Sequence, residues 1–136
     1  MKNANPYLFF NDGKCTQAME YYKSIFGGEL QLMKVGDVKQ EMFKDMDPNV
    51  VMHGILKTPT FQIMSSDNMS GDTVVGDNVC IYLDCSSKEE VDTTYAALVK
   101  NGEESMTPEP TFWGAYFGSL TDAYGISWML SFENKS

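Results

Sequence analysis

The segment MHGILKTPTFQIM, residues Met52–Met64, decides the fold because it aligns without a gap with FGSLTDAYGISWM, residues Phe117–Met129. A second pair of segments aligns in the same order, Leu8-Phe9-Phe10 with Ile81-Tyr82-Leu83. Internal similarity of this kind indicates two copies of one supersecondary unit. The sequence therefore predicts a pseudo-twofold domain in which each half contributes strands to a curved sheet.

Each half shows the order strand, helix and three strands, which predicts an α+β fold with two βαβββ repeats in a curved mixed or antiparallel sheet. The halves span residues 1–68 and 79–136 of one domain and are joined by the polar segment 69–78. The segment Lys39–Asn49 is expected to be a loop or an irregular edge. The expected strands are Tyr7–Asn11, Glu29–Val35, Met52–Lys57, Phe61–Ser66, Val79–Asp84, Glu104–Thr107, Ala115–Thr121 and Ile126–Phe132, and the expected helices are Cys15–Phe26 and Ser87–Asn101.

The composition limits the classes of function. The chain has 136 residues, 43% of them hydrophobic, and a formal net charge of −9, which is typical of a globular protein. Binding along a phosphate backbone needs clustered Lys and Arg, so we expect no nucleic-acid partner. No stretch approaches the ~20 apolar residues of a membrane span, so we expect no membrane partner. Cys15, Cys80 and Cys85 cannot close a complete set of disulfides, and reduced thiols indicate a cytoplasmic protein.

Two groups of motifs resemble one known family. Tyr7-Leu8-Phe9-Phe10, with the later Ala18-Met19-Glu20-Tyr21-Tyr22, resembles the opening of PhnB-like domains, a branch of the glyoxalase/bleomycin-resistance (vicinal oxygen chelate) superfamily. Thr111-Phe112-Trp113-Gly114-Ala115-Tyr116-Phe117-Gly118 and the following Thr121–Trp128 resemble its second half. The resemblance covers nearly the whole chain and implies a glyoxalase-like cup and a homodimer. It implies no single reaction, because the superfamily includes lyases, dioxygenases, thiol transferases and drug-binding proteins.

Members of this branch have been labelled demethylubiquinone methyltransferases, and that label implies a cofactor. The sequence has no Gly-x-Gly-x-x-Gly after a strand, the fingerprint expected of a dinucleotide or adenosyl site. We therefore expect no cofactor.

The resemblance also identifies the positions at which metal-dependent members place His or Glu ligands, on the first and fourth strands of each half. The corresponding residues here are Tyr7, Met64, Cys80 and Met129. Divalent metals of these enzymes prefer imidazole and carboxylate ligands, so we expect no catalytic metal in the cup. One alternative is a soft cuprous site made by Met64, Cys80 and Met129. The competing interpretation is that these side chains form an adaptable apolar lining.

Strand alternation constrains the register of these positions. If Met64 and Met129 face the cup, then Ile63 and Trp128 face the helices and belong to the core. A slip of one residue would turn those large groups into the cavity and would bring the polar Ser65 into the core. The apolar pattern therefore favours a single register.

The ligand-binding candidates face the expected cup or lie beside it: Tyr7, Phe9, Asn11, His53, Met64, Cys80, Tyr82, Trp113 and Met129. His53, the weak catalytic candidate, is either a general base or a hydrogen-bonded structural residue. Trp113 is expected in the cavity wall or in a dimer contact. Asp67 could orient a ligand, or form an Asx turn before Asn68. Cys80 has no histidine neighbour that would activate it as a nucleophile.

Three functions are consistent with this pattern. The first is a metal-independent, small-molecule-binding protein of the PhnB-like type, whose partner is a small ligand. The second is an enzyme that uses His53, Tyr7 or Cys80 for lyase- or isomerase-type proton transfer on a small oxygenated substrate. The third is a drug-sequestering resistance protein, for which the charge of −9 would attract a cationic drug. Unpaired carboxylates in the cup would favour the third.

Overall fold

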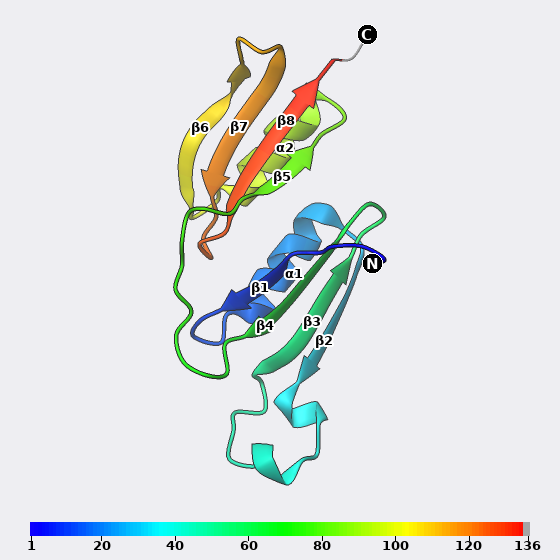
Figure 1. Ribbon diagram of the computed structural model, residues 1–136, viewed down its shortest axis with the longest axis vertical. Coiled ribbons are helices and arrows are strands. Elements are labelled where there is room, and N and C mark those ends of the chain that lie inside the picture. Colours follow the sequence, from blue (N-terminus) through cyan, green and yellow to red (C-terminus); the bar gives the residue numbers. More distant parts are fainter. Residues whose placement is uncertain (135–136) are drawn as a thin grey trace. The chain divides into compact units, whose positions relative to one another are not determined.

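The computed structural model describes residues 1–134 and divides into two compact units, Met1–Val74 and a second that begins at Val75. Each unit contains one four-stranded sheet and has the element order βαβββ (Figure 1). The predicted α+β class and the two βαβββ halves are therefore confirmed. None of the helices within the described residues has the length and apolar character that crossing a membrane requires.

The first unit has strand order β1-β4-β3-β2, with β1 parallel to β4 and the other pairs antiparallel. Its elements are β1 (Tyr7–Phe10), α1 (Cys15–Phe26), β2 (Glu29–Lys34), β3 (Val51–Lys57) and β4 (Gln62–Asp67). The segment between β2 and β3, expected to be irregular, contains two short 3-10 helices, η1 (Val35–Asp37) and η2 (Glu41–Phe43).

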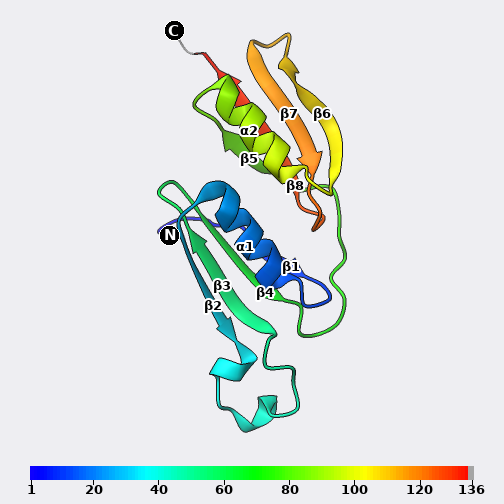
Figure 2. The same cartoon turned by 180° about the vertical axis from the view of Figure 1, so that it is seen from behind.

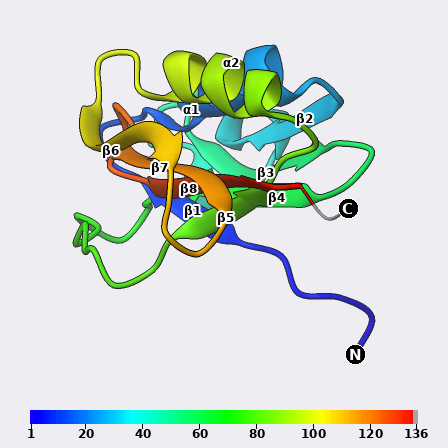
Figure 3. The same cartoon turned by 90° about the horizontal axis from the view of Figure 1, so that it is seen from above.

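The second unit repeats this topology with strand order β5-β8-β7-β6, and β5 is parallel to β8. Its elements are β5 (Ile81–Asp84), α2 (Lys88–Leu98), β6 (Glu103–Pro110), β7 (Ala115–Thr121) and β8 (Ser127–Glu133). Within each unit, the α-helix lies against one face of its own sheet, as the view from behind shows for α1 and the view from above shows for α2 (Figures 2 and 3).

Local sequence signals explain where the helices begin and end. Gly27 ends α1 with a φ of 73°, a left-handed conformation that glycine adopts at little cost. At the start of α2, the Ser87 hydroxyl accepts a hydrogen bond from the Glu90 N–H, and the Glu90 carboxylate accepts one from the Ser86 N–H. This arrangement is a capping box whose return bond reaches one residue further back than usual.

One face of each sheet is buried beneath its helix, as strand alternation predicts. In the first unit this face carries Leu56 and Ile63, and in the second it carries Trp128 and Leu130, all fully buried. The expected core position of Trp128 is confirmed. The argument that placed Ser65 outside the core is wrong, because Ser65 follows Ile63 by two residues and shares its face. Ser65 is fully buried, and its hydroxyl oxygen accepts a hydrogen bond of 3.3 Å from the Cys15 thiol.

The gap-free alignment of the two halves is also wrong, by one residue. When Met64 is matched to Met129, Ser65 matches Leu130. Gly54 pairs with Ser65 and Gly118 pairs with Leu130, so Gly54 and Gly118 are equivalent, whereas the gap-free alignment sets them one residue apart. The connection from β7 to β8, residues 122–126, is one residue longer than residues 58–61 between β3 and β4. The extra residue lies in the loop and leaves the ladders in register.

The alignment of the first strands is shifted by two residues. Tyr7 pairs with Met64 in β4, and Tyr82 pairs with Met129 in β8. The counterpart of Tyr7 is therefore Tyr82 rather than Cys80, which precedes β5. A shift of two residues keeps each side chain on its expected face, because the strand period is two.

The Asp67 carboxylate connects three elements of the first unit. It accepts a hydrogen bond of 2.9 Å from the N–H of Cys15, at the start of α1, and another of 2.9 Å from the N–H of Val51, at the start of β3. Asp67 is 4% exposed. It therefore forms neither the Asx turn nor the ligand contact considered above. It supplies the N-terminal cap that Lys14 cannot provide.

We predict that Asp67→Asn lowers the free energy of unfolding by about 2–4 kcal/mol, because a hydrogen bond to a charged group contributes about 1.5–3 kcal/mol and the amide adds a buried donor without a partner. Urea unfolding measures this change. The matched control is Asp45→Asn, an exposed loop residue that should change the value by less than about 0.5 kcal/mol. Equal stability of the two variants would contradict the capping role.

Candidate functional site

The sheet face opposite α1, called here the first open face, presents a group of large apolar side chains. Tyr7 pairs with Met64, which pairs with Ile55, and Phe9 lies on the same face two residues after Tyr7. On β2, Met33 also lies on this face. Phe9 is 54% exposed, Met33 44% and Tyr7 37%, although each is large and apolar or aromatic. Exposed apolar surface of this kind is typical of interaction sites.

A tyrosine–histidine pair lies within this face. The Tyr7 hydroxyl oxygen is 3.2 Å from Nδ1 of His53, and the two rings are stacked with centroids 5.7 Å apart. The Phe9 ring lies 5.0 Å from the Tyr7 ring. The contact joins β1 to β3 across β4. In one histidine tautomer the hydroxyl donates to Nδ1, and in the other Nδ1–H donates to the hydroxyl oxygen.

The sequence identified both members of this pair but not their contact. It predicted strands without a strand order, and only the order β1-β4-β3 brings Tyr7 and His53 together. The partner of His53 is a phenol, which suits hydrogen bonding and proton transfer.

Asn11 lies just after β1, and its side-chain amide is engaged within the protein. Its Oδ1 accepts a hydrogen bond of 2.7 Å from the Thr73 N–H, and its Nδ2 donates one of 3.0 Å to the Thr73 carbonyl oxygen. The Asn68 amide also donates to the Thr73 hydroxyl, at 2.6 Å. These bonds attach the connecting segment to the end of β1. They give Asn11 a structural role that the sequence did not indicate.

The sheet face opposite α2, called here the second open face, carries the remaining candidates. Tyr82 pairs with Met129, and both side chains are exposed. Trp113 lies in the turn between β6 and β7, with its ring 5.8 Å from Phe117 and 4.9 Å from Phe112. Trp113 is half-exposed and Phe112 is almost fully exposed, so this turn presents aromatic surface to its surroundings.

The three thiols are poor nucleophiles at neutral pH. Burial raises the pKa of Cys15 to about 11, against a smaller lowering by its hydrogen bond to Ser65. Burial also raises the pKa of Cys85 to about 11, with a further increase from the nearby Glu90 carboxylate. Desolvation raises the pKa of Cys80 as well. Since the thiolate is the reactive form, none of the three is activated.

The cuprous site considered for Met64, Cys80 and Met129 has no support within either unit. Met64 belongs to the first unit, and in the second unit Cys80 lies before β5, outside the ladder that pairs Tyr82 with Met129. Within residues 1–134, no three or more His, Cys, Asp or Glu side chains form a group that could hold a metal ion. The expectation that the cup lacks a catalytic metal remains a prediction.

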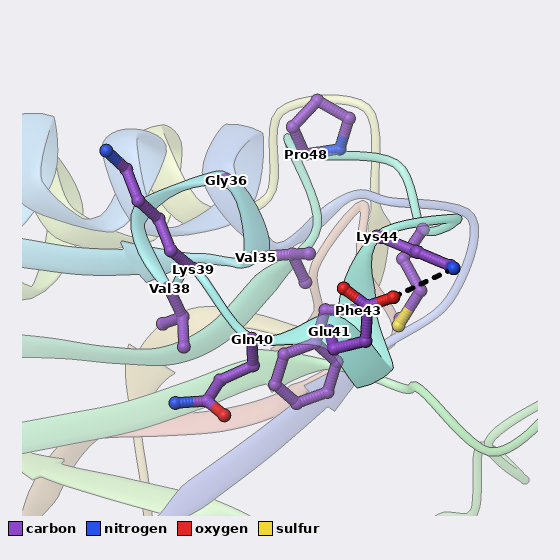
Figure 4. Close-up of a pocket in the computed structure, with 10 residues that line it drawn as sticks. Val35, Gly36, Val38, Lys39, Gln40, Glu41, Phe43, Lys44 and Pro48 are labelled. Carbon is purple, nitrogen blue, oxygen red and sulfur yellow. Dashed lines mark hydrogen bonds and ion pairs between the residues drawn. The ribbon is translucent and has the colours of Figure 1, made fainter.

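A pocket of about 430 Å³ lies in the segment between β2 and β3, and none of the site residues proposed from the sequence lines it (Figure 4). Its wall combines apolar side chains with two lysines, and Lys44 forms an exposed ion pair of 2.9 Å with Glu41. The lining residues are Val35, Gly36, Val38, Lys39, Gln40, Glu41, Phe43, Lys44, Met46 and Pro48. The sequence did not indicate this pocket, because irregular segments have no period from which side-chain directions follow.

Comparisons with known proteins place this architecture in a family. Residues 2–131 match the family described as 3-demethylubiquinone-9 3-methyltransferase. The protein YjdN of Escherichia coli K12 is 30% identical over 139 aligned residues, which cover 93% of this chain and 92% of that protein. Protein PA1353 from Pseudomonas aeruginosa is 33% identical, and its crystal structure superposes with a TM-score of 0.87 over 99% of this chain and 100% of that one.

Two more distant structures show the same fold. A putative 3-demethylubiquinone-9 3-methyltransferase, the PhnB protein of Bacillus cereus, is 23% identical with a TM-score of 0.79 over 96% of this chain and 99% of that one. A glyoxalase/bleomycin resistance protein/dioxygenase family enzyme from Burkholderia phytofirmans is 16% identical with a TM-score of 0.60 over 96% and 100% of the two chains. The chain therefore belongs to the family described as 3-demethylubiquinone-9 3-methyltransferase, and it shares its fold with the PhnB protein of Bacillus cereus and with the glyoxalase/bleomycin resistance protein/dioxygenase family enzyme.

Proposed function

We propose that this protein binds a small molecule on the first open face, against Tyr7, Phe9, Met33, His53 and Met64. The observation that carries this proposal is the Tyr7–His53 contact of 3.2 Å, which lies within exposed aromatic and thioether side chains. Ligand sites typically combine an apolar surface with a few polar groups that fix orientation. The thioethers of Met33 and Met64 adapt their shape to the molecule that they contact.

The chemistry of this face favours a flat, uncharged aromatic molecule that carries an oxygen substituent. The rings of Tyr7 and Phe9 offer stacking surfaces, and the Tyr7–His53 pair offers a donor and an acceptor. Glu29 on β2 and Lys57 on β3 are opposite each other in the strand register at one end of the face, so neither sign of charge dominates there. Binding here needs no metal, because the ligand contacts are aromatic, thioether and hydrogen-bonding groups.

The name of the matched family implies a methyl donor, but the residues of this chain do not fit an adenosyl group. Such a group is bound where a glycine-rich loop links a strand of a parallel sheet to a helix whose N-terminal N–H groups face the ligand. Here residues 11–14 link β1 to α1, and Gly13 is their one glycine. The Cys15 N–H at the helix start is bonded to Asp67. No methyl-transfer step therefore follows from these residues.

A second candidate function is proton transfer on a small oxygenated substrate, and the same pair favours it. A phenol and an imidazole in hydrogen-bond contact can exchange a proton, and imidazole is the side-chain group that most often serves as a general acid or base. His53 would take a proton from carbon or oxygen, and Tyr7 would donate one to the developing oxyanion. Cys80 has no part in this candidate, because desolvation raises the pKa of its thiol.

For the binding function, we predict that 2-naphthol binds the wild type in isothermal titration calorimetry. Tyr7→Phe and His53→Gln should each weaken binding by about threefold to tenfold, the loss expected for one hydrogen bond. The matched control is Tyr82→Phe, which removes the equivalent phenol of the second unit and should leave the affinity unchanged. Equal losses in all three variants, or no binding by the wild type, would contradict the assignment of this face.

For the proton-transfer candidate, we predict that the wild type accelerates exchange of the α-protons of dihydroxyacetone into D₂O, followed by NMR. Tyr7→Phe and His53→Gln should reduce the acceleration about 100-fold or more, because a positioned acid or base contributes that much. Exchange at the buffer rate with wild-type protein would exclude this chemistry for dihydroxyacetone and leave the binding function as the one supported.

We also propose that the protein is a homodimer, supported by the aromatic turn at Phe112 and Trp113. Phe112 is 98% exposed, an unfavourable state for a large apolar side chain that an intersubunit contact would relieve. Light scattering at micromolar concentration should give the mass of two chains, and Phe112→Ser should shift the population toward one chain. A wild-type monomer under these conditions would refute the proposal.

A further inference from the structure

The connection between β2 and β3, called here the β2–β3 loop, is much longer than the fold requires. It comprises residues 35–50, whereas the equivalent connection of the second unit, between β6 and β7, comprises only residues 111–114. Both join the second and third strands of the same topology, so a connection of the shorter length is enough. Loops of more than about 12–15 residues are uncommon in compact domains and are usually functional when they are ordered. The extra length of the β2–β3 loop therefore needs an explanation beyond the fold.

Backbone hydrogen bonds close this loop at its base. The Val35 N–H donates to the Val50 carbonyl oxygen, and the Gly36 N–H donates to the Pro48 carbonyl oxygen, both at 2.9 Å. A Cβ atom at Gly36 would lie 2.9 Å from Cβ of Pro48, so the two arms of the loop are in close contact there. The short helices η1 and η2 shape the remainder. A compact loop whose ends lie close together is an Ω-loop, and such loops are frequently functional.

The pocket of about 430 Å³ lies within this loop and has largely apolar walls. Figure 4 shows Val35 in the middle of the loop, with Lys39 on one side of it and Lys44 on the other. Val35 is 3% exposed, and the Phe43 and Met46 side chains, which also line the pocket, are half-buried. Sites for small molecules have volumes of about 300–1,000 Å³ and combine apolar walls with a few polar groups. The size and the lining of this pocket match that description.

One positive charge at the pocket has no partner within the protein. The charged residues that line the pocket are Lys39, Glu41 and Lys44. Lys44 and Glu41 form an ion pair of 2.9 Å, so their charges cancel. Within residues 1–134, no ion pair or hydrogen bond engages the Lys39 ammonium group. The other carboxylates of the loop do not line the pocket, and two of them, Asp37 and Asp47, accept hydrogen bonds from backbone N–H groups.

We propose that the pocket of the β2–β3 loop binds a small apolar carboxylate. The carboxylate group accepts a hydrogen bond from the Lys39 ammonium group, and the apolar part lies against Val35, Phe43 and Met46. The net charge of −9 repels anions at long range, so a preference for an anion would have to come from a local cation. The pocket shares no residue with the first open face, and the proposal does not depend on the function proposed for that face.

The test compares 1-adamantanecarboxylate with 1-adamantanecarboxamide, which has nearly the same shape and no charge. In calorimetry at pH 7 and low salt, the wild type should bind the carboxylate at least about threefold more tightly than the amide, as expected for a charge-assisted hydrogen bond to an exposed lysine. Lys39→Gln should remove this preference. The matched control is Lys100→Gln, which removes the same charge from an exposed position of the second unit and should preserve it. His53→Gln should also preserve it, because His53 lies on the first open face.

Glu41→Gln provides a readout of opposite sign. It removes the carboxylate that pairs with Lys44 and leaves a second uncompensated cation at the pocket. The variant should therefore bind the carboxylate probe about twofold to threefold more tightly than the wild type, and the affinity for the amide should stay the same. Damage to the loop would weaken the binding of both probes instead, so this variant separates an electrostatic effect from a structural one.

Methionine methyl groups locate the bound probe. In NMR spectra of protein with ¹³C-labelled methionine methyl groups, the carboxylate should shift the Met46 resonance, assigned with Met46→Leu, and leave those of Met33 and Met64 on the first open face unchanged. An unshifted Met46 resonance would overturn the proposal. Equal affinity of the wild type for the two probes would also overturn it, as would the same loss in Lys39→Gln and Lys100→Gln, a loss in His53→Gln, or weaker binding by Glu41→Gln.

Discussion

Each four-stranded sheet in this protein is covered by one helix, and the rest of the structure depends on this constraint. A helix buries one face of a sheet. Because successive side chains of a strand point to opposite faces, alternate residues of each strand lie on the face that the helix does not cover. The buried faces hold the fully enclosed Leu56, Ile63, Trp128 and Leu130. The opposite faces hold Tyr7, Phe9, Tyr82 and Met129, which are large and yet exposed. Exposed apolar surface therefore arises on the second side of a sheet whose first side forms a small core.

The two halves keep the same framework and have diverged on their open faces. Ser66 and Ser131 occupy equivalent positions on β4 and β8, given the match of Met64 to Met129. On β3 of the first half, His53 directly precedes Gly54, the partner of Ser65, and on β7 of the second half Phe117 pairs with Ser131. On the other side of the serine, the first half has Phe9 and the second has Asp84. The two halves thus carry two surfaces of different chemistry on the same strand topology.

Much of the fold could be predicted from the sequence, and the errors have specific physical causes. Helix α1 and strand β7 were predicted with their exact bounds, because apolar periodicity and glycine stops are local signals. The residue-by-residue match between the two halves was harder to predict from the sequence. The extra residue of the β7–β8 connection lies in a turn, where neither periodicity nor burial marks an insertion. The core position of Ser65 was missed because a polar residue was assumed to avoid the core, although the Cys15 thiol supplies its hydrogen bond there.

The site was predictable as a set of residues and not as an arrangement. Alternation placed Tyr7 on the face away from the helices, whereas His53 was a candidate because of the chemistry of its side chain. The pairing itself depends on strand order, which no local pattern encodes. The roles of Asp67 and Asn11 were inaccessible for the same reason, since their partners lie 52 and 62 residues away in the chain.

The bonds between Asn11 and Thr73 have a consequence for how the gene could be divided. Thr73 lies beyond the last strand of the first unit. The Asn11 side chain nevertheless bonds both its N–H and its carbonyl oxygen, the two groups that a neighbouring strand would bond. A cut made directly after β4 would separate this anchor from the half to which it is bonded. A cut between Val74 and Val75 would keep donor and acceptor in one fragment. That peptide bond is therefore the natural junction for split-protein fragments or for new termini in a circular permutant.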